Sequence, residues 1–204
     1  MSTATMTVME RLRAETAAHH ARAEGKAIQR DMVAGSIVRE RYAAWLGQML
    51  LVHRALERAI DARRSHFAPL AVVTDEQRHS ARIEQDLRFY DADVPSIRPS
   101  PGAAGLIARI AEADGPTLLG MVYVLEGSMN GNRYIVMALR KGLDLNPGEG
   151  DRYLDPYGEH QRPKWAAWKG AVDAEAISPA EADAAVAGAG AMFDGVAAIS
   201  DDLA

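Results

Sequence analysis

The sequence predicts an all-α protein, and three observations lead to that prediction. Its periodic segments place apolar residues at the spacing of a helix. Several of these segments begin with Ser, Thr or Pro at positions that cap or open helices. No segment shows the alternation of a half-buried strand, and the apolar run at 70–73 is too short to count as one. Without a repeat, a low-complexity linker or a change in composition, residues 1–204 are expected to form a single domain.

The apolar periodicity and the cap residues together define the expected helices. The predicted helices span about residues 5–24, 36–64, 74–90, 103–113, 116–142, 164–175 and 179–203. The residues expected at their ends are Ser36, Pro116, Gly142, the capping box of Thr74 and Gln77, and the capping box of Ser178 and Glu181. Residues 91–102 contain three prolines and residues 142–163 lack a periodic pattern, so both are expected to be loops.

Composition excludes several classes of function. The net charge is −5 and the basic residues are scattered, so no nucleic-acid partner is expected. The chain has no cysteine, which excludes disulfides, thiolate metal sites and cysteine nucleophiles. Charged residues interrupt the N-terminal segment early, and no uninterrupted apolar stretch reaches the roughly 18–20 residues of a membrane span. The expected protein is soluble and cytoplasmic, without membrane contact.

The longest predicted helix carries a line of glycines. At about 100° per residue, Gly120, Gly127 and Gly131 lie within about 40° of one another on its surface, with Tyr123 beside them. Each glycine costs a helix about 0.5–1 kcal/mol relative to alanine, so a compensating gain is expected. Close packing of two helices would supply that gain, and so would a flat ligand lying against bare backbone at a glycine–serine kink. The helix alone leaves both readings open.

Two of the six histidines, His19 and His20, lie on the apolar side of the first predicted helix. A neutral imidazole there is either a structural residue or a ligand for haem iron, and the periodicity does not choose between the two histidines. The chain has one Glu-x-x-His pair, Glu76 with His79, whereas a ferritin-like di-iron site needs two. Because its helix is strongly polar, this pair is expected on a solvated face.

Four segments together resemble the haem oxygenase family, in the order that the family has them. The stretch YVLEG at 123–127, followed by Gly131, resembles the family's distal helix. Residues 157–174 and 178–193 are similar to its aromatic-rich helix and its last helix. The resemblance covers most of the chain and implies a haem-oxygenase-like helical bundle, with haem between the first, proximal helix and a kinked, glycine-bearing distal helix. The first helix matches the family pattern at Leu12, Arg13, Thr16, His20, Ala23 and Glu24.

The resemblance also implies roles for individual residues. It selects His20 rather than His19 as the ligand of the haem iron. Arg13 and Lys169 match basic positions that face the haem propionates. The expected haem-binding set is therefore Arg13, His20, Glu24, Tyr123 and Lys169, and the residues expected around bound oxygen are Gly127, Ser128, Gly131 and Asn132.

Two features depart from the family pattern. Asn132 stands where the family has the second glycine of a Gly-Gly pair, and Asn130 precedes Gly131. Ser128 stands where many members have an aspartate that organises distal water. The Asn132 side chain would donate a hydrogen bond to bound dioxygen, narrow the site, or mark a relative that binds a tetrapyrrole without degrading it.

The function that the resemblance implies is oxidative cleavage of haem to biliverdin, carbon monoxide and ferrous iron. Haem would be both substrate and cofactor, dioxygen the oxidant, and a ferredoxin or a flavoprotein reductase the electron donor. A bilin-accepting photoreceptor is a candidate partner for the product. The alternatives are a haem- or bilin-binding protein without turnover, a di-iron oxidase, and a thiaminase-like enzyme, for which the chain lacks the cysteine nucleophile.

Overall fold

The computed structural model describes residues 6–204. The regular structure of these residues is helical throughout, which confirms the predicted all-α class. Short 3-10 turns lie at Ala68–Val72, Asp75–Gln77, Val94–Ser96 and Gly158–His160. The α-helices are α1 (Val8–Glu15), α2 (Ala17–Glu24), α3 (Ala27–Ala34), α4 (Arg39–Arg63), α5 (Ser80–Phe89), α6 (Pro101–Glu112), α7 (Gly115–Leu143), α8 (Gln161–Asp173) and α9 (Pro179–Asp202).

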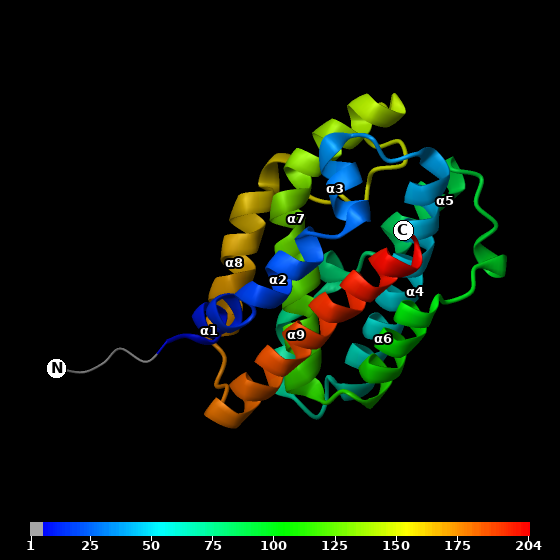
Figure 1. Cartoon of the computed structure of the whole chain (residues 1–204). Helices are drawn as coiled ribbons and strands as arrows, with labels where there is room; N and C mark the ends of the chain where they lie inside the picture. Colours follow the sequence, from blue (N-terminus) through cyan, green and yellow to red (C-terminus); the bar gives the residue numbers. More distant parts are fainter. Residues whose placement is uncertain (1–5) are drawn as a thin grey trace.

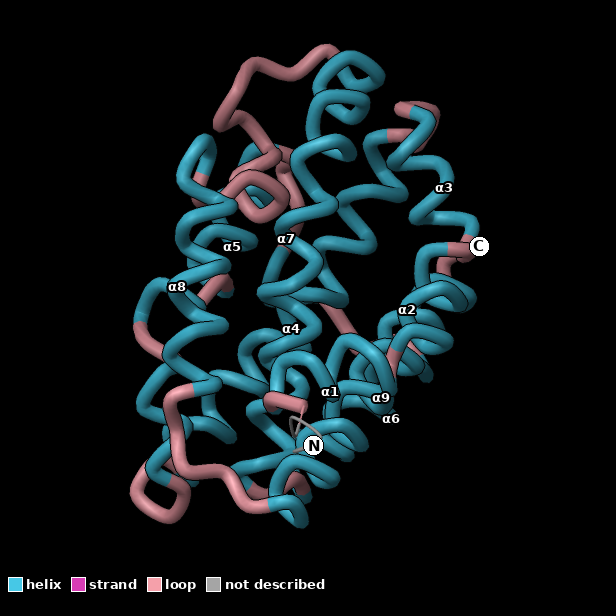
Figure 2. Tube along the Cα trace, turned by 90° about the vertical axis from the view of Figure 1, so that its left-hand side faces the viewer, coloured by secondary structure: helices cyan, strands magenta, loops and turns pink. Residues whose placement is uncertain are grey.

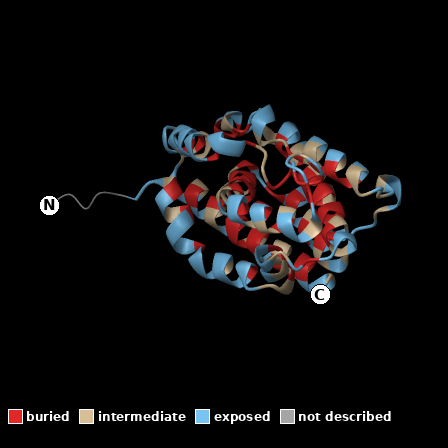
Figure 3. Cartoon of the chain, turned by 90° about the horizontal axis from the view of Figure 1, so that it is seen from above, coloured by how far each residue is buried: buried red, intermediate tan, exposed pale blue. Residues whose placement is uncertain are grey.

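The 29-residue helix α7 lies at the centre of the fold. Figure 1 shows α9 crossing α7, and α8 running along another side of α7. Seen from the side in Figure 2, α8 and α2 lie on opposite sides of α7. The buried side chains occupy the faces that the helices turn toward one another (Figure 3). This arrangement places α1 and α2 against α9, at the end of the molecule where the predicted site lies.

Two glycines allow α7 and α9 to cross at close range. A Cβ atom on Gly120 would lie 1.8 Å from the carbonyl oxygen of Ala185, and one on Gly188 would lie 2.1 Å from that of Thr117. No side chain fits at either position, so Gly120 belongs to a helix–helix contact. Of the predicted glycine line, only Gly127 and Gly131 are left to face a ligand.

The prediction of one continuous helix over 5–24 is wrong, because the structure has two helices, α1 and α2, in this range. Residue 5 lies outside the described residues. The helix is interrupted between α1 and α2 at Thr16, where the backbone leaves the helical region (φ −102°, ψ 5°) and the hydroxyl donates to the carbonyl of Leu12 (2.6 Å).

Helix α3 is absent from the prediction. It ends at Gly35 in the left-handed conformation (φ 66°), which is the usual glycine signal for a helix end.

The predicted caps have mixed outcomes. Ser36 does not cap a helix, because α4 begins only at Arg39, and the Ser36 hydroxyl instead donates to the carbonyl of Asp31 (3.4 Å). Thr74 and Gln77 do form the predicted capping box. That box begins a 3-10 turn instead of the long helix that the sequence predicts, because the chain breaks again before α5.

Gly142 does not end α7. The helix continues to Leu143 and is closed by Asp144 in the left-handed conformation (φ 54°). Gly142 instead lies against Gly35, whose carbonyl oxygen would be 2.0 Å from a Cβ atom at position 142. The glycine therefore serves a close contact between the end of α3 and α7.

Helix α9 begins with the predicted capping box of Ser178 and Glu181, which is confirmed. Within residues 6–204 it is the one helix that is long and apolar enough to cross a membrane by composition (mean hydropathy 1.3 over 18 residues). Half of that window is buried inside the fold, and the helix packs against α6 and α7. These contacts explain why α9 is so apolar: it is a helix of the protein core.

Candidate functional site

Two adjoining cavities open between α7 and the N-terminal helices α1 and α2. The larger, of about 700 Å³, also contacts α8, and the smaller, of about 340 Å³, extends to residues of α3 and α4. Volumes of about 300–1,000 Å³ are typical of small-molecule sites. The residues that line both cavities are His20, Val124, Gly127, Ser128, Asn130 and Phe193.

Every residue that the sequence predicts for the site lines one of these cavities. They come from four helices, α1, α2, α7 and α8, and the fold brings them together around these two adjoining cavities. Their roles remain predictions. The larger cavity is lined by Arg13, Tyr123 and Lys169, the smaller by Glu24, Gly131 and Asn132, and both by His20, Gly127 and Ser128.

The two histidines on α2 have different surroundings. His20 lies in the wall of both cavities, about half of its side chain is exposed, and its ring meets that of Phe193 edge-on (centroids 5.3 Å apart). Its Nδ1 faces the Glu24 carboxylate at 3.4 Å, which directs the Nδ1 proton there and leaves the Nε2 lone pair free. His19 instead pairs with Asp194 on α9 (2.9 Å). Of the two, only His20 is placed to hold a ligand in the cavity.

Polar contacts hold the N-terminal helices beside the cavity. The backbone N–H of Met9 donates to Asp173 on α8 (3.0 Å), and Arg11 pairs with Asp183 on α9 (2.7 Å). Together the two contacts connect α1 to both helices that border the site, and so set where this wall of the cavity lies.

The glycine-bearing face of α7 forms another wall. A Cβ atom on Gly131 would meet no heavy atom within 4 Å, and one on Gly127 would meet only the ring of Trp165, at 3.5 Å. Unlike Gly120, neither glycine is required for helix packing. Their effect is to leave the backbone of α7 bare where it borders the cavity.

Side chains in this stretch also bond back to the helix itself. The Ser128 hydroxyl donates to the carbonyl of Leu125 (2.7 Å), and the Asn130 amide donates to that of Gly127 (3.3 Å). Such bonds compete with helical bonding and favour bending. The backbone stays helical throughout, and Figure 1 shows the last part of α7 leaning away from its first part. The side-chain bonds of Ser128 and Asn130 are thus local causes of the bend that the sequence predicts in α7.

Two cations lie at the edge of the larger cavity. Arg13 on α1 is exposed and Lys169 on α8 is half-buried, with its ammonium 5.7 Å from the ring centre of Trp165. Burial raises the pKa of the Tyr123 phenol, and the nearby positive charge of Arg13 opposes that rise. A ligand with negatively charged groups would therefore meet two positive charges as it enters.

Several wall residues lie outside the predicted set. Trp165 packs between Tyr123 and Trp168, with ring centres 5.8 and 5.4 Å away. The smaller cavity is completed by the buried residues Met32, Trp45, Met49, Tyr153 and Leu154. In the sequence these residues have the apolar or aromatic character of any core position, and no motif distinguishes them. Only the packing of distant helices identifies them as part of the site.

A buried polar layer lies on the opposite side of α7. His79 is fully buried, and its Nε2 lies 2.6 Å from Glu126 Oε1. The predicted solvated face of the Glu76–His79 pair is therefore wrong for His79, although Glu76 is exposed. The physical reason is the break between the 3-10 turn and α5, which separates the two residues and turns His79 toward α7.

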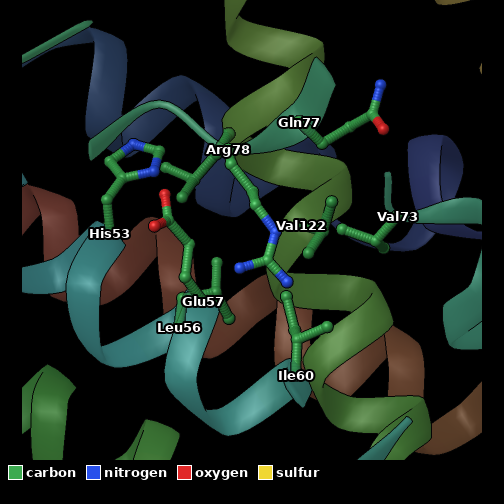
Figure 4. A pocket seen from close by; sticks show the side chains of 9 residues that line it. His53, Leu56, Glu57, Ile60, Val73, Gln77, Arg78 and Val122 are labelled. Atoms are coloured by element: carbon green, nitrogen blue, oxygen red, sulfur yellow. The ribbon is translucent and has the colours of Figure 1, made fainter. Parts of the chain in front are cut away.

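His53 belongs to the same layer and borders a small cavity that has room for about one water molecule (Figure 4). Its Nε2 lies 3.0 Å from the Tyr153 hydroxyl. Burial lowers the pKa of His53 well below its usual value, so the imidazole is neutral near pH 7. Figure 4 shows Glu57 and the Arg78 guanidinium facing the same space, with Val122 of α7 beside them.

Asp86 connects α5 to the segment that carries Tyr153. The buried carboxylate accepts the backbone N–H groups of Arg152 (2.9 Å) and Tyr153 (2.8 Å). Burial raises its pKa from the usual 3.8 to about 6, although both hydrogen bonds favour the charged form. Because the folded protein binds this proton more tightly than the unfolded chain does, the contribution of Asp86 to stability is greatest below about pH 4 and is lost as the pH rises through 6.

This difference predicts a pH-dependent effect of Asp86→Asn. From pH 4 to pH 7, the free energy of unfolding of the wild type should fall relative to that of the variant by on the order of 2–3 kcal/mol. Urea unfolding of the apo proteins at several pH values measures it. A difference between the two proteins that stays constant from pH 4 to pH 7 would show that Asp86 does not titrate in this range.

Comparison with known proteins agrees with this fold. The heme oxygenase family model matches residues 6–201. The structure of heme oxygenase-2 from Synechocystis is 21% identical, with a TM-score of 0.89 over 97% of this chain and 85% of that one. The heme oxygenase structure from Leptospira interrogans is 20% identical, with a TM-score of 0.87 over 96% of this chain and 98% of that one.

A curated heme oxygenase from Pyropia yezoensis is 21% identical over 155 residues. That match spans 73% of this chain and 65% of the relative, a little less than two thirds of its length. The structural neighbours establish a haem-oxygenase-like fold, and the family match covers the helices that build the cavities. From the near-complete match to the family model, we conclude that this chain belongs to the haem oxygenase family.

Proposed function

We propose that this chain binds haem in the cavities beside α2 and α7 and cleaves it to biliverdin, carbon monoxide and ferrous iron, using dioxygen and external electrons. The observation that carries the proposal is that His20 and the bare backbone at Gly127 and Gly131 line the same space. The Synechocystis relative supports it, since its structure contains haem and nitric oxide.

The residues around the cavity fit a haem group. A neutral imidazole is the usual protein ligand of haem iron, and Glu24 beside Nδ1 of His20 directs Nε2 toward the cavity. The missing side chains at Gly127 and Gly131 give a flat ring room to approach α7. Arg13 and Lys169 line the larger cavity, where they would offer positive charge to the ring's two propionates.

Bound haem would provide the iron and the ring on which the chemistry with dioxygen and external electrons takes place. The chain's own residues would position the haem and control water. His20 would hold the iron. Gly127 and Gly131 leave the backbone of α7 bare where it would border the ring and a small ligand such as dioxygen. The Ser128 hydroxyl donates its hydrogen bond to the Leu125 carbonyl. The lone pairs of the Ser128 oxygen are therefore available to accept from a water molecule in the cavity.

A second candidate is haem or bilin binding without turnover, and one observation favours it. Asn132 is buried in the wall of the smaller cavity, where the family has glycine, with its amide 3.3 Å from the Met129 sulfur. Its side chain narrows the space beside Gly131. The oxygenase remains the better supported proposal, because Gly127 and Gly131 leave the backbone of α7 bare beside the cavities.

The reaction requires partners that belong to the proposal. A ferredoxin or a flavoprotein reductase would supply electrons, and a bilin-accepting photoreceptor is a candidate recipient of the product. The absence of a basic cluster argues against a nucleic-acid partner. We place the protein in the cytoplasm as a single domain over residues 1–204.

The test is to add one equivalent of haemin to the purified protein and follow the visible spectrum in air after a reductase and ferredoxin are supplied. The oxygenase predicts loss of the haem bands, a biliverdin spectrum and release of one equivalent of carbon monoxide. A haem complex that is reduced and reoxidised without losing its ring would contradict the oxygenase and support the binding protein.

Lys169→Ala should change the orientation of haem more than its affinity. An ion pair at a partly exposed position is worth about 0–1 kcal/mol, so haem affinity should fall by less than about tenfold. Because the ring is nearly symmetric, losing one propionate contact should alter the ratio of biliverdin isomers, as measured by chromatography. Lys164→Ala is the matched control, since Lys164 on the same helix pairs with Glu76 (2.6 Å) and lines neither cavity. An unchanged isomer ratio in Lys169→Ala would remove this role.

A further inference from the structure

Glu126 is a buried carboxyl group that the proposed binding of haem does not use. It directly precedes Gly127, is only 4% exposed, and lines neither of the two cavities. On a helix its side chain projects about 100° away from that of its neighbour, toward the buried side of α7. An unpartnered carboxylate is costly to bury, so its partners indicate what it does.

Its two oxygens have partners from two separate parts of the chain. His79, just before α5, places Nε2 2.6 Å from Oε1, and Tyr157, before α8, places its hydroxyl 3.0 Å from Oε2. The Arg82 guanidinium lies 3.1 Å from His79 Nδ1. A guanidinium only donates, so Nδ1 must accept, and the His79 proton is on Nε2, where it is donated to Glu126. The imidazole is thus a neutral donor with a fixed orientation.

Few side chains hold α7 in place near Glu126, so the hydrogen bonds of this residue matter there. Its cavity face has no side chains at Gly127 and Gly131, so packing on that side is sparse. The small cavity of Figure 4 lies behind it, against Val122 and Leu125, so packing on the buried side is incomplete as well. The hydrogen bonds of Glu126 lie between these two gaps and come from two directions. They therefore restrict rotation of the helix about its own axis.

We propose that Glu126 is a positioning residue that fixes the rotation of α7, and with it the distance of Gly127 and Ser128 from a ligand in the cavity. The consequence for catalysis rests on the proposed function. With Cα atoms about 2.3 Å from the helix axis, a rotation of about 20° moves them by about 0.8 Å. A displacement near 1 Å in a catalytic site can lower the rate by about 100-fold.

Two substitutions separate hydrogen bonding from packing. Glu126→Gln keeps both contacts, because the amide oxygen accepts from His79 and the amide NH₂ donates to the Tyr157 oxygen. The Tyr157 proton, which the wild-type carboxylate accepts (3.0 Å), then turns to the Glu76 carbonyl (2.8 Å). Glu126→Leu has a similar size and removes both. Leu118→Ala is the control for lost stability, since Leu118 is fully buried on α7 and lines neither cavity.

The first measurement is amide hydrogen exchange of the apo proteins over residues 123–134. Glu126→Leu should speed exchange there more than elsewhere, Glu126→Gln should restore the wild-type pattern, and Leu118→Ala should lower the melting temperature without a selective change at 123–134. The second is the spectrum of the ferric haem complex against pH, in which only Glu126→Leu should shift the midpoint between its acid and alkaline forms. Turnover per bound haem should then fall about 10- to 100-fold in Glu126→Leu and less than threefold in Glu126→Gln.

The proposal is overturned if Glu126→Leu behaves like Leu118→Ala, or if Glu126→Gln is as damaged as Glu126→Leu. If Glu126→Leu does not fold, Tyr157→Phe removes one of the two bonds and should give smaller changes of the same kind. Unchanged exchange and spectrum in Tyr157→Phe would then overturn it. Because exchange is measured without haem, a wild type that fails to bind or degrade haem would refute the proposed function and leave the positioning result standing on its own.

Discussion

His20→Ala is expected to abolish haem degradation. The imidazole is the one side chain on α2 that lines both cavities with a nitrogen free for iron. Loss of even an outer-shell partner of a metal ligand typically costs 10–100-fold, so loss of the ligand itself should reduce turnover by more than about 100-fold. The ferric spectrum should change to that of a haem without a histidine ligand, and added imidazole should restore it.

His19→Ala is the matched control, because His19 is adjacent on the same helix and is held by Asp194 instead of lining the cavity. It should retain the wild-type spectrum and turnover. If His19→Ala loses the spectrum while His20→Ala keeps it, the assignment is shifted by one residue and the geometry derived for His20 is wrong.

Replacing Gly131 should separate stability from activity. A Cβ atom there meets nothing within 4 Å, and alanine favours a helix by up to about 1 kcal/mol over glycine. Gly131→Ala should therefore raise the melting temperature of the apo protein by about 2–4 °C. Turnover per bound haem should fall, and Gly131→Leu should abolish it, because the larger side chain fills the space that dioxygen needs.

Gly120→Ala provides the opposite case on the same helix. Its Cβ atom would lie 1.8 Å from the Ala185 carbonyl oxygen, so α7 and α9 would have to separate, and overpacking of this kind costs about 1–3 kcal/mol. The melting temperature should fall. If Gly131→Ala lowers apo stability as Gly120→Ala does and leaves turnover per bound haem unchanged, Gly131 is a packing residue and not part of the pocket.

The fold class could be predicted because helical periodicity and cap residues are local features of the sequence. The site residues were expected from the resemblance to a family, and their roles stay predictions. The structure brings His20 and the glycines at 127 and 131 of α7 to the same cavity. The role of Gly120 could not be separated from those of Gly127 and Gly131 in this way. All three share one side of the helix, and only the approach of α9 distinguishes them.

The features that the sequence could not predict depend on contacts between distant elements. His79 reads as an exposed residue of a polar helix, and it is buried because a break before α5 turns it toward Glu126. The break at Thr16 is likewise hidden in a continuous helical pattern. The end of α3 at Gly35 did carry a local signal, since a glycine after an apolar turn is a common helix end.

The measurement that tests this account most directly is a crystal structure of the ferric haem complex. We expect the ring between α2 and α7, with the iron bonded to Nε2 of His20, the propionates near Arg13 and Lys169, and the opposite face against the backbone of Gly127 and Gly131. Iron bonded to another residue, or a ring outside the space that His20 and the two glycines share, would contradict it.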